Sequence, residues 1–136
     1  MGRSLRIEAG AYLLWALWLY LLPLPWVLGA VLAGVVHELG HLIALRIAHV
    51  PVYSVSIGGM GAKIETGPMS RIQEIFCSLS GPLCSFLLLF LCKIYPEAAL
   101  CGLLQGLFNL IPLYPMDGGR AIRCLIGRKR LTNSHW

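Results

Sequence analysis

The chain has 136 residues, of which 57% are hydrophobic and only 12% are charged, and its formal net charge is +5. Together with a mean hydropathy of +0.74, this composition excludes an ordinary soluble enzyme and indicates a polytopic membrane protein. A chain of this length has room for one domain of about four spans, and no separate soluble regulatory module is expected.

The first part of the chain predicts two antiparallel spans. Residues 9–22 form an apolar run that follows a short segment with two arginines, and we interpret it as a first span and not as a cleaved signal peptide. Pro23 and Pro25 cannot continue a helix. A second span is therefore expected from about residue 26 to residue 49.

The second span contains the sequence HELGH at residues 37–41. On a helix, His37 and His41 project from one face and can bind one metal ion together. Glu38 beside them is the kind of base that metal-assisted hydrolysis needs. A chance match on a soluble helix, with both histidines held by ordinary hydrogen bonds, is the alternative. Inside a bilayer such a cluster is costly unless it is paired or metal-bound, which favours a zinc site for peptide hydrolysis.

Residues 50–67 have a different character, with β-branched residues on both sides of a glycine-rich turn at 58–61. This alternation predicts a β-hairpin between the second and third spans. A plain connecting loop is the alternative. In the functional interpretation, the strand that contains Ser54 and Ser56 lies beside the site and pairs through its main chain with an extended substrate segment.

The second half of the chain predicts two further spans. The third lies within residues 69–93, where Ser80-Gly81-Pro82 forms a small-residue patch suited to close helix packing. The fourth begins at Pro96, and its Gln105 and Asn109 share one face and point away from lipid. Three serines of the third span are expected to face other helices: Ser78, Ser80 and Ser85.

A third candidate ligand follows the fourth span. Pro112 and Pro115 unwind the chain there, and Gly118-Gly119 lets the backbone turn tightly past Asp117. Broken backbone at membrane depth is tolerated only where it lines a cavity or packs on protein. Because two histidines leave a metal short of a third protein ligand, we expect Asp117 to complete the site. The alternatives are an N-cap for a helix over residues 118–126 and an ion pair with Arg120.

Positive charge is distributed unevenly about the predicted spans. Ten of the 11 Lys and Arg residues fall on the side that holds both chain ends and the hairpin, and only Lys93 falls on the other side. The positive-inside rule makes the crowded side cytoplasmic. We interpret the basic run at residues 128–130 as a contact with the lipid surface, and no nucleic-acid partner is expected.

HELGH on one span and NLIPLYPMDGGR (residues 109–120) at the end of another together resemble the site-2 proteases, the zinc intramembrane metalloproteases. The glycine pair at 58–59, the charged strand after it and the Ser-Gly-Pro patch most resemble the bacterial sporulation branch, which trims a membrane-tethered pro-sigma factor. That branch usually continues into further spans and a CBS domain, and other branches carry PDZ domains. Neither domain is expected in this chain.

The resemblance implies a role for each residue of the two motifs. One zinc ion per chain would be held by His37, His41 and Asp117. Glu38 would be the catalytic acid/base, and Asn109 would hold substrate backbone.

The sequence thus predicts an all-α polytopic protein of a bacterial cell membrane, with about four transmembrane helices, a small membrane-associated β-hairpin and both termini in the cytoplasm. Its expected function is zinc-dependent hydrolysis of a peptide bond within or near a transmembrane segment of a membrane-anchored protein, such as a regulatory factor. A further membrane protein is expected as a regulatory partner. The alternative is a catalytically silent relative that binds a membrane partner as a scaffold.

Overall fold

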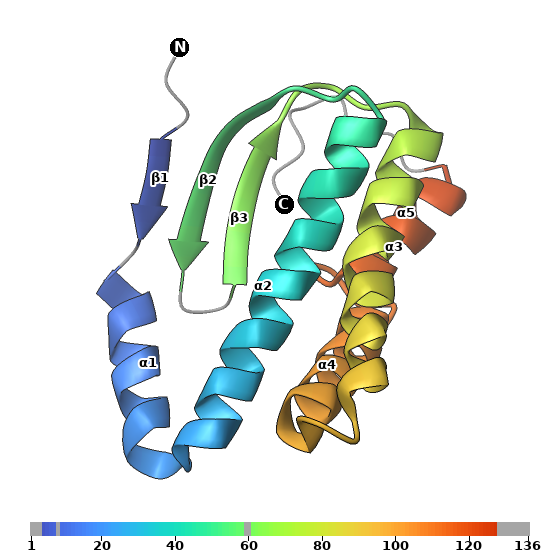
Figure 1. Cartoon of the computed structure of the whole chain (residues 1–136). Coiled ribbons are helices and arrows are strands. Elements are labelled where there is room, and N and C mark those ends of the chain that lie inside the picture. Colours follow the sequence, from blue (N-terminus) through green and yellow to red (C-terminus); the bar gives the residue numbers. More distant parts are fainter. Residues whose placement is uncertain (1–3, 8, 59–60, 128–136) are drawn as a thin grey trace.

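The computed structural model describes residues 4–7, 9–58 and 61–127. A small sheet lies on one side of the long helix α2, and the remaining helices of the second half of the chain lie on its other side (Figure 1). In chain order the elements are β1 (Ser4–Ile7), α1 (Ala9–Leu21), α2 (Leu24–Ile47), β2 (Val52–Gly58), β3 (Gly61–Thr66), α3 (Arg71–Leu87), the 3-10 helix η1 (Leu88–Leu91), α4 (Pro96–Asn109) and α5 (Asp117–Leu125).

Helix α2 begins and ends for local reasons. Pro25 lies in its first turn, where a missing N–H breaks no intrahelical bond. At the other end His49 takes a left-handed conformation with φ of 55°. The N–H of Val50 donates to Leu45 O over 2.9 Å and that of His49 donates to Arg46 O over 3.1 Å, which is the bond pattern of a Schellman motif. Val50 and Leu45 are both buried and supply its hydrophobic contact.

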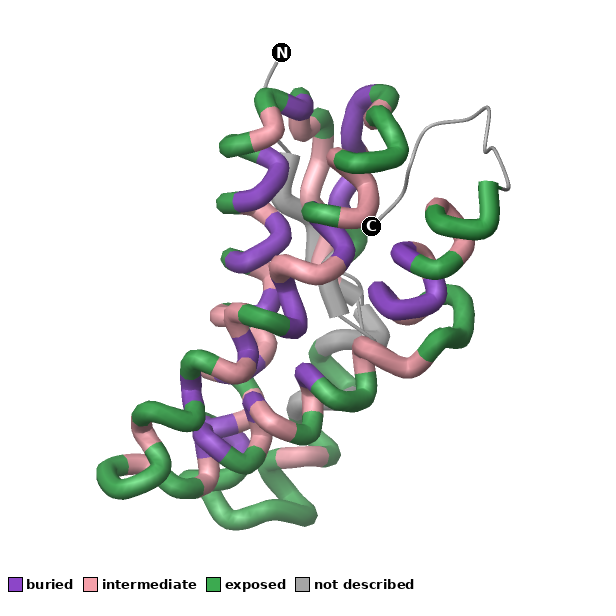
Figure 2. The backbone as a smooth tube through the Cα atoms, turned by 90° about the vertical axis from the view of Figure 1, so that its right-hand side faces the viewer, coloured by how far each residue is buried: buried purple, intermediate pink, exposed green. Residues whose placement is uncertain are grey.

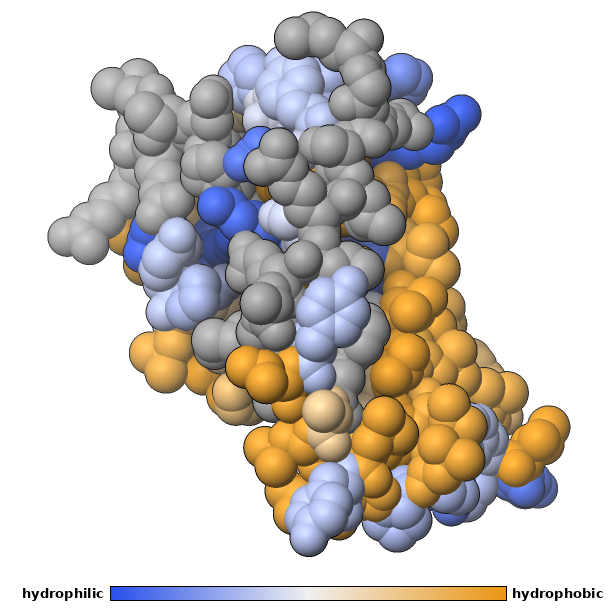
Figure 3. All heavy atoms as spheres, turned by 90° about the vertical axis from the view of Figure 1, so that its left-hand side faces the viewer, coloured by the Kyte–Doolittle hydropathy of each residue, from blue (hydrophilic) through white to orange (hydrophobic). Residues whose placement is uncertain are grey.

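The two faces of α2 have the polarity expected in lipid. One face buries small residues and the histidines, including Ala33, Gly40 and Ala44. The opposite face carries five large aliphatic side chains, three or four residues apart and between 42% and 54% exposed: Leu28, Val31, Val35, Leu39 and Ile43. Such a stripe would be an anomaly in water but suits contact with acyl chains. Apolar residues cover most of the lower part of the molecule, below hydrophilic residues that gather toward the top (Figure 3).

Among the described residues, two helices are long and apolar enough to cross a membrane, namely α2 and the continuous helical stretch of α3 and η1. With 24 residues, α2 is about 36 Å long at 1.5 Å per residue, which exceeds the ~30 Å hydrocarbon core. The helices α1 and α4, with 13 and 14 residues, reach only about 20 Å. The structure therefore supports two complete spans of the four expected, with α1 and α4 as shorter helices.

The predicted hairpin is present, but its sheet has a third strand. Strands β2 and β3 pair antiparallel, and β1 pairs parallel with the other side of β2, so that the order is β1-β2-β3. The sequence predicts only a charged flank where β1 lies. Because the described residues form a three-stranded sheet, the fold is not all-α as expected. A four-residue strand whose partner lies far along the chain has no local signature, because strand preference depends on the neighbour it packs against.

The sheet order corrects the expectation for Ser54 and Ser56. Both lie on the middle strand β2, which is paired on both sides. Their hydroxyls are engaged as well: Ser54 Oγ donates to Glu65 Oε2 at 2.7 Å and Ser56 Oγ donates to Lys63 O at 3.4 Å. An extended peptide can add to this sheet only at β1 or β3, the two edge strands.

Helix α3 connects the end of α2 to α5. Ser70 and Gln73 form a capping box at its start, and Gln73 Nε2 donates to Ala48 O at 2.9 Å. Burial, with a hydrogen bond to Glu74 of α3, raises the pKa of the Cys124 thiol on α5 to about 12. Buried residues line the long helices and the first turn of α5 (Figure 2). A small apolar core joins α2, β3 and α3: Ala44, Leu45, Val50, Ile64 and Cys77.

Candidate metal centre

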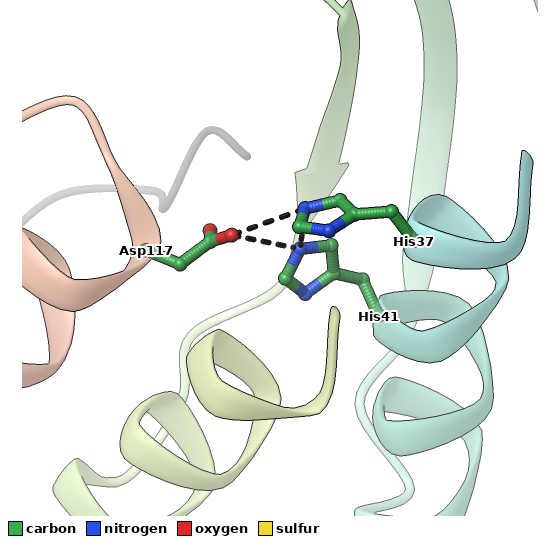
Figure 4. Close-up of side chains that lie close together, drawn as sticks. All are labelled: His37, His41 and Asp117. Atoms are coloured by element: carbon green, nitrogen blue, oxygen red, sulfur yellow. Dashed lines mark hydrogen bonds and ion pairs between the residues drawn. The ribbon is translucent and has the colours of Figure 1, made fainter. Parts of the chain in front are cut away.

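The two histidines of the HELGH sequence lie on adjacent turns of α2 and point the same way, as their four-residue spacing predicts (Figure 4). His37 and His41 are each only 4% exposed. Their Nε2 atoms lie 3.2 Å apart. The helix therefore presents two imidazole nitrogens to one point inside the protein.

Asp117 approaches that point from the opposite side (Figure 4). Its Oδ2 lies 3.2 Å from His37 Nε2 and 3.3 Å from His41 Nε2, and the residue is buried. The N-cap interpretation of Asp117 is wrong, because Met116 takes the N-cap position and Asp117 is the first helical residue of α5. Two imidazoles and a carboxylate thus converge from two separate elements.

The glycines after Asp117 allow this approach. A Cβ at Gly118 would collide with the carbonyl oxygen of Leu110, and a Cβ at Gly119 would collide with the main chain of Leu113. The first turn of α5 therefore packs directly on the chain that leaves α4. Any side chain at either position would push Asp117 away from the histidines.

Helix α3 holds both imidazoles from behind. His41 Nδ1 lies 2.8 Å from Cys77 O, and His37 Nδ1 lies 3.0 Å from Ser85 Oγ. Because a carbonyl can only accept, His41 donates from Nδ1, and in the neutral ring the lone pair of Nε2 then points at Asp117. A Cβ at Gly81 would collide with the His41 ring, so the Ser-Gly-Pro patch does pack closely, against a histidine.

The three converging atoms fit a tetrahedral divalent cation such as zinc. Their separations of 3.2–3.3 Å compare with about 3.3–3.5 Å between ligands that are about 2.0–2.2 Å from zinc in tetrahedral geometry. Asp117 Oδ2 is within ion-pair distance of both rings, yet this buried atom accepts no hydrogen bond from the described residues. A buried carboxylate oxygen in that position costs several kcal/mol unless a cation neutralises it. His37, His41 and Asp117 therefore can hold one metal ion.

Two further predicted residues lie near these elements. Glu38 follows His37 on α2 and is half-buried. Asn109 is the last residue of α4, and its Nδ2 donates to Gln105 O at 3.0 Å. The catalytic role of Glu38 and the substrate contact of Asn109 stay predictions.

Comparisons with known proteins point to one fold. No family model matches the sequence. The solved site-2 protease of Methanocaldococcus jannaschii matches 95% of this chain and 69% of its own, with a TM-score of 0.75 and 24% sequence identity. The chain has the site-2 protease fold. The predicted resemblance is thereby confirmed at the level of the fold.

Sequence relatives extend this result. A zinc metalloprotease of M. jannaschii is 30% identical over 109 residues, which are 70% of this chain and 32% of the relative. The protein sll0528 of Synechocystis is 30% identical over 125 residues, which cover 75% of this chain and 33% of the relative. The chain is therefore a distant homologue of zinc metalloproteases, and it has the site-2 protease fold. It spans about a third of the length of the curated relatives that it matches.

Sequence reasoning missed one residue of the site. Ser85 was expected only to face another helix, and in the site-2 protease fold of this chain it contacts the His37 ring. The available signal was a serine within an apolar span. Its contact with a histidine could be inferred only from the packing of α3 against α2.

Proposed function

We propose that this chain is a zinc-dependent intramembrane peptidase of the site-2 type, which hydrolyses a peptide bond within or near a transmembrane segment of a membrane-anchored protein. One observation carries the proposal: two imidazole nitrogens and a carboxylate oxygen converge at 3.2–3.3 Å inside a bundle of apolar helices. Intramembrane ionisable groups of this kind are functional by default, because they are costly to keep.

Each residue of the two motifs has a part in this reaction. His37, His41 and Asp117 hold one zinc ion per chain. Zinc supplies Lewis-acid chemistry, which polarises a carbonyl and brings the pKa of water to about 7. Glu38 accepts the proton of the attacking water and passes it to the leaving amine. Asn109 holds the substrate backbone from the end of α4.

The substrate enters in extended form along an edge of the sheet, since a helical peptide hides its scissile bond. Strands β1 and β3 lie at the edges of the described sheet, where a further strand can add, whereas β2 is paired on both sides. Photocrosslinking from position 63 on β3 to a membrane-anchored substrate tests this placement, and substrate that crosslinks at neither edge strand would contradict it. A regulatory factor is the substrate class that the likeness to the sporulation branch favours, with a membrane protein as regulatory partner.

The sheet and the end of α2 face the cytoplasm in this proposal. Arg46 in the last turn of α2 and Lys63 on β3 are exposed, and Lys93 lies at the turn between η1 and α4. Arg3 and the basic run at 128–130, on which the predicted orientation also rests, lie outside the described residues. Cysteines placed at positions 63 and 93, in a variant without native cysteines, should label from opposite sides of the membrane; labelling of position 63 from outside only would reverse the orientation.

Glu38→Gln is the variant that tests the reaction. Gln is close to Glu in size but cannot accept the proton, so cleavage should fall by about 10²–10⁴-fold while zinc stays near one per chain. Membrane proteomes of cells with the wild type and with the variant should differ by a fragment that disappears. Cleavage within tenfold of the wild type would contradict the role of Glu38. Identical fragments in both would favour the silent scaffold.

A further inference from the structure

Ser85 of α3 stands directly behind His37. Its side chain is fully buried, and its Oγ makes two contacts, with His37 Nδ1 at 3.0 Å and with Gly81 O at 3.2 Å. We propose that Ser85 is a positioning residue of the metal centre, whose hydroxyl accepts a hydrogen bond from His37 Nδ1 and so fixes the ring with a bare Nε2 toward the metal. This role deepens the proposed function and rests on it.

The proton count of the hydroxyl determines the direction of these bonds. Ser85 Oγ carries one proton and donates it to Gly81 O, which can only accept. The contact with His37 is then a hydrogen bond only if the imidazole supplies the proton from Nδ1. In that tautomer Nε2 is an acceptor, as a metal ligand must be.

The two histidines are held by different kinds of partner. His41 donates to Cys77 O, a main-chain group that no substitution removes, whereas His37 depends on a side chain. Cys77, Gly81 and Ser85 are spaced four residues apart on α3, so one face of this helix contacts both rings. A single side-chain substitution can therefore remove the Nδ1 partner of His37 but not that of His41.

Without the Ser85 hydroxyl, a competing arrangement becomes available. Nδ1 of His37 would lose its acceptor in a buried site, and the proton would then favour Nε2. From there it can donate to Asp117 Oδ2, only 3.2 Å away. That hydrogen bond occupies both atoms that should bind the metal. Groups that orient a metal-bound histidine typically contribute ten- to a hundredfold in metal affinity.

Ser78 offers a matched control on the same helix. Its side chain is equally buried, but its Oγ has no hydrogen-bond partner among the described residues. Alanine at position 78 or 85 removes the same atom from the same kind of environment. The two variants therefore differ in the hydrogen bonds that are lost: Ser78→Ala loses none, whereas Ser85→Ala loses the contacts with His37 and with Gly81 O.

The first experiment measures zinc affinity of the full chain in lipid nanodiscs, by competition with a chelator of known affinity. Ser85→Ala should bind zinc ten- to a hundredfold more weakly than the wild type, and Ser78→Ala should stay within about threefold. Equal affinities of Ser85→Ala and the wild type would overturn the role of Ser85. Equal losses in both variants would also overturn it, since they would trace to packing alone.

The second experiment needs no metal and separates this role from the proposed function. Nitrogen NMR of metal-free protein with labelled histidines distinguishes a proton on Nδ1 from one on Nε2. His37 should carry its proton on Nδ1 in the wild type and in Ser78→Ala, and should shift toward Nε2 in Ser85→Ala. An unchanged His37 signal in Ser85→Ala would refute the role of Ser85. A wild type with the expected signal that binds no zinc would refute the zinc-dependent function and leave the role of Ser85 in place.

Discussion

The metal centre is assembled from two regions that the sequence encodes in different ways. His37 and His41 lie on one continuous helix, and their separation follows from a four-residue spacing. Asp117 lies far along the chain on the nine-residue helix α5, and reaches the site only because α5 packs on α3 and on the chain after α4. The histidine region is local, whereas the aspartate region exists only in the packed structure.

The two regions also differ in whether the protein supplies hydrogen-bond partners for their buried polar atoms. Each imidazole has a partner on α3 for the nitrogen that faces away from the site. Asp117 Oδ2 is buried without a hydrogen bond from the described residues. The protein itself therefore supplies the partners that the histidines need, whereas the buried carboxylate of Asp117 needs a cation. This difference predicts which substitutions damage metal binding and which part of the fold responds to the metal.

Asp117→Asn should have the largest effect on metal binding. It keeps the shape of the side chain but removes the charge that balances a divalent ion, so zinc affinity should fall by more than the ten- to hundredfold typical of residues behind the ligands. Metal content after dialysis against a chelator measures the loss.

Arg120→Ala is the control for the ion-pair alternative, because Arg120 lies three residues after Asp117. It should leave zinc in place. Full zinc occupancy in Asp117→Asn would overturn its assignment as a ligand. Equal destabilisation by the two substitutions, with zinc retained in both, would favour the ion pair.

Gly118→Ala should separate packing of the aspartate region from its chemistry. The added Cβ meets the carbonyl oxygen of Leu110, which is backbone and cannot rotate away, so about 1–3 kcal/mol of stability should be lost. The thermal unfolding temperature and the zinc affinity should both decrease.

The matched change in the histidine region is Gly34→Ala on α2, where a Cβ meets nothing within 4 Å. That substitution should be neutral or stabilise by up to about 1 kcal/mol, since alanine favours a helix interior. A Gly118→Ala variant as stable as Gly34→Ala would show that α5 does not depend on this close approach.

The same contrast explains how much the sequence could predict. The break at Pro23 and Pro25 and the common face of the histidines follow from local rules, and the structure contains both. The position of Asp117 was expected from broken backbone and from a motif, without the contacts that hold it. Strand β1 was missed, and Ser54 and Ser56 were assigned to substrate, because sheet order depends on pairing between distant segments.

Ser85 shows the same limit within a helix. The sequence predicts that it faces another helix, but its contact with His37 depends on how α2 and α3 pack together. Local spacing gave the ligands of one region, and tertiary packing was needed for their partners.

Removal of the metal should produce a local effect, confined to the start of α5. Without a cation, the Asp117 carboxylate faces the lone pairs of two imidazole nitrogens, which repel it. The first turn of α5 should then be less stable. The rest of α5 still packs on α3, and the contacts of the histidines with α3 do not involve the metal. Amide exchange should therefore accelerate at Arg120, whose N–H donates to Met116 O over 3.1 Å.

Hydrogen exchange read by mass spectrometry, with and without a chelator, measures this difference. About tenfold faster exchange in the first turn of α5 corresponds to roughly 1.4 kcal/mol of local stability. Peptides from α2 around Leu45 should not change and serve as the internal reference. Equal acceleration in α2 would mean that the metal stabilises the whole core. No acceleration in α5 would mean that packing on α3 alone holds Asp117 in place. The histidine and aspartate regions would then differ in how the sequence encodes them, but neither would need a cation for its stability.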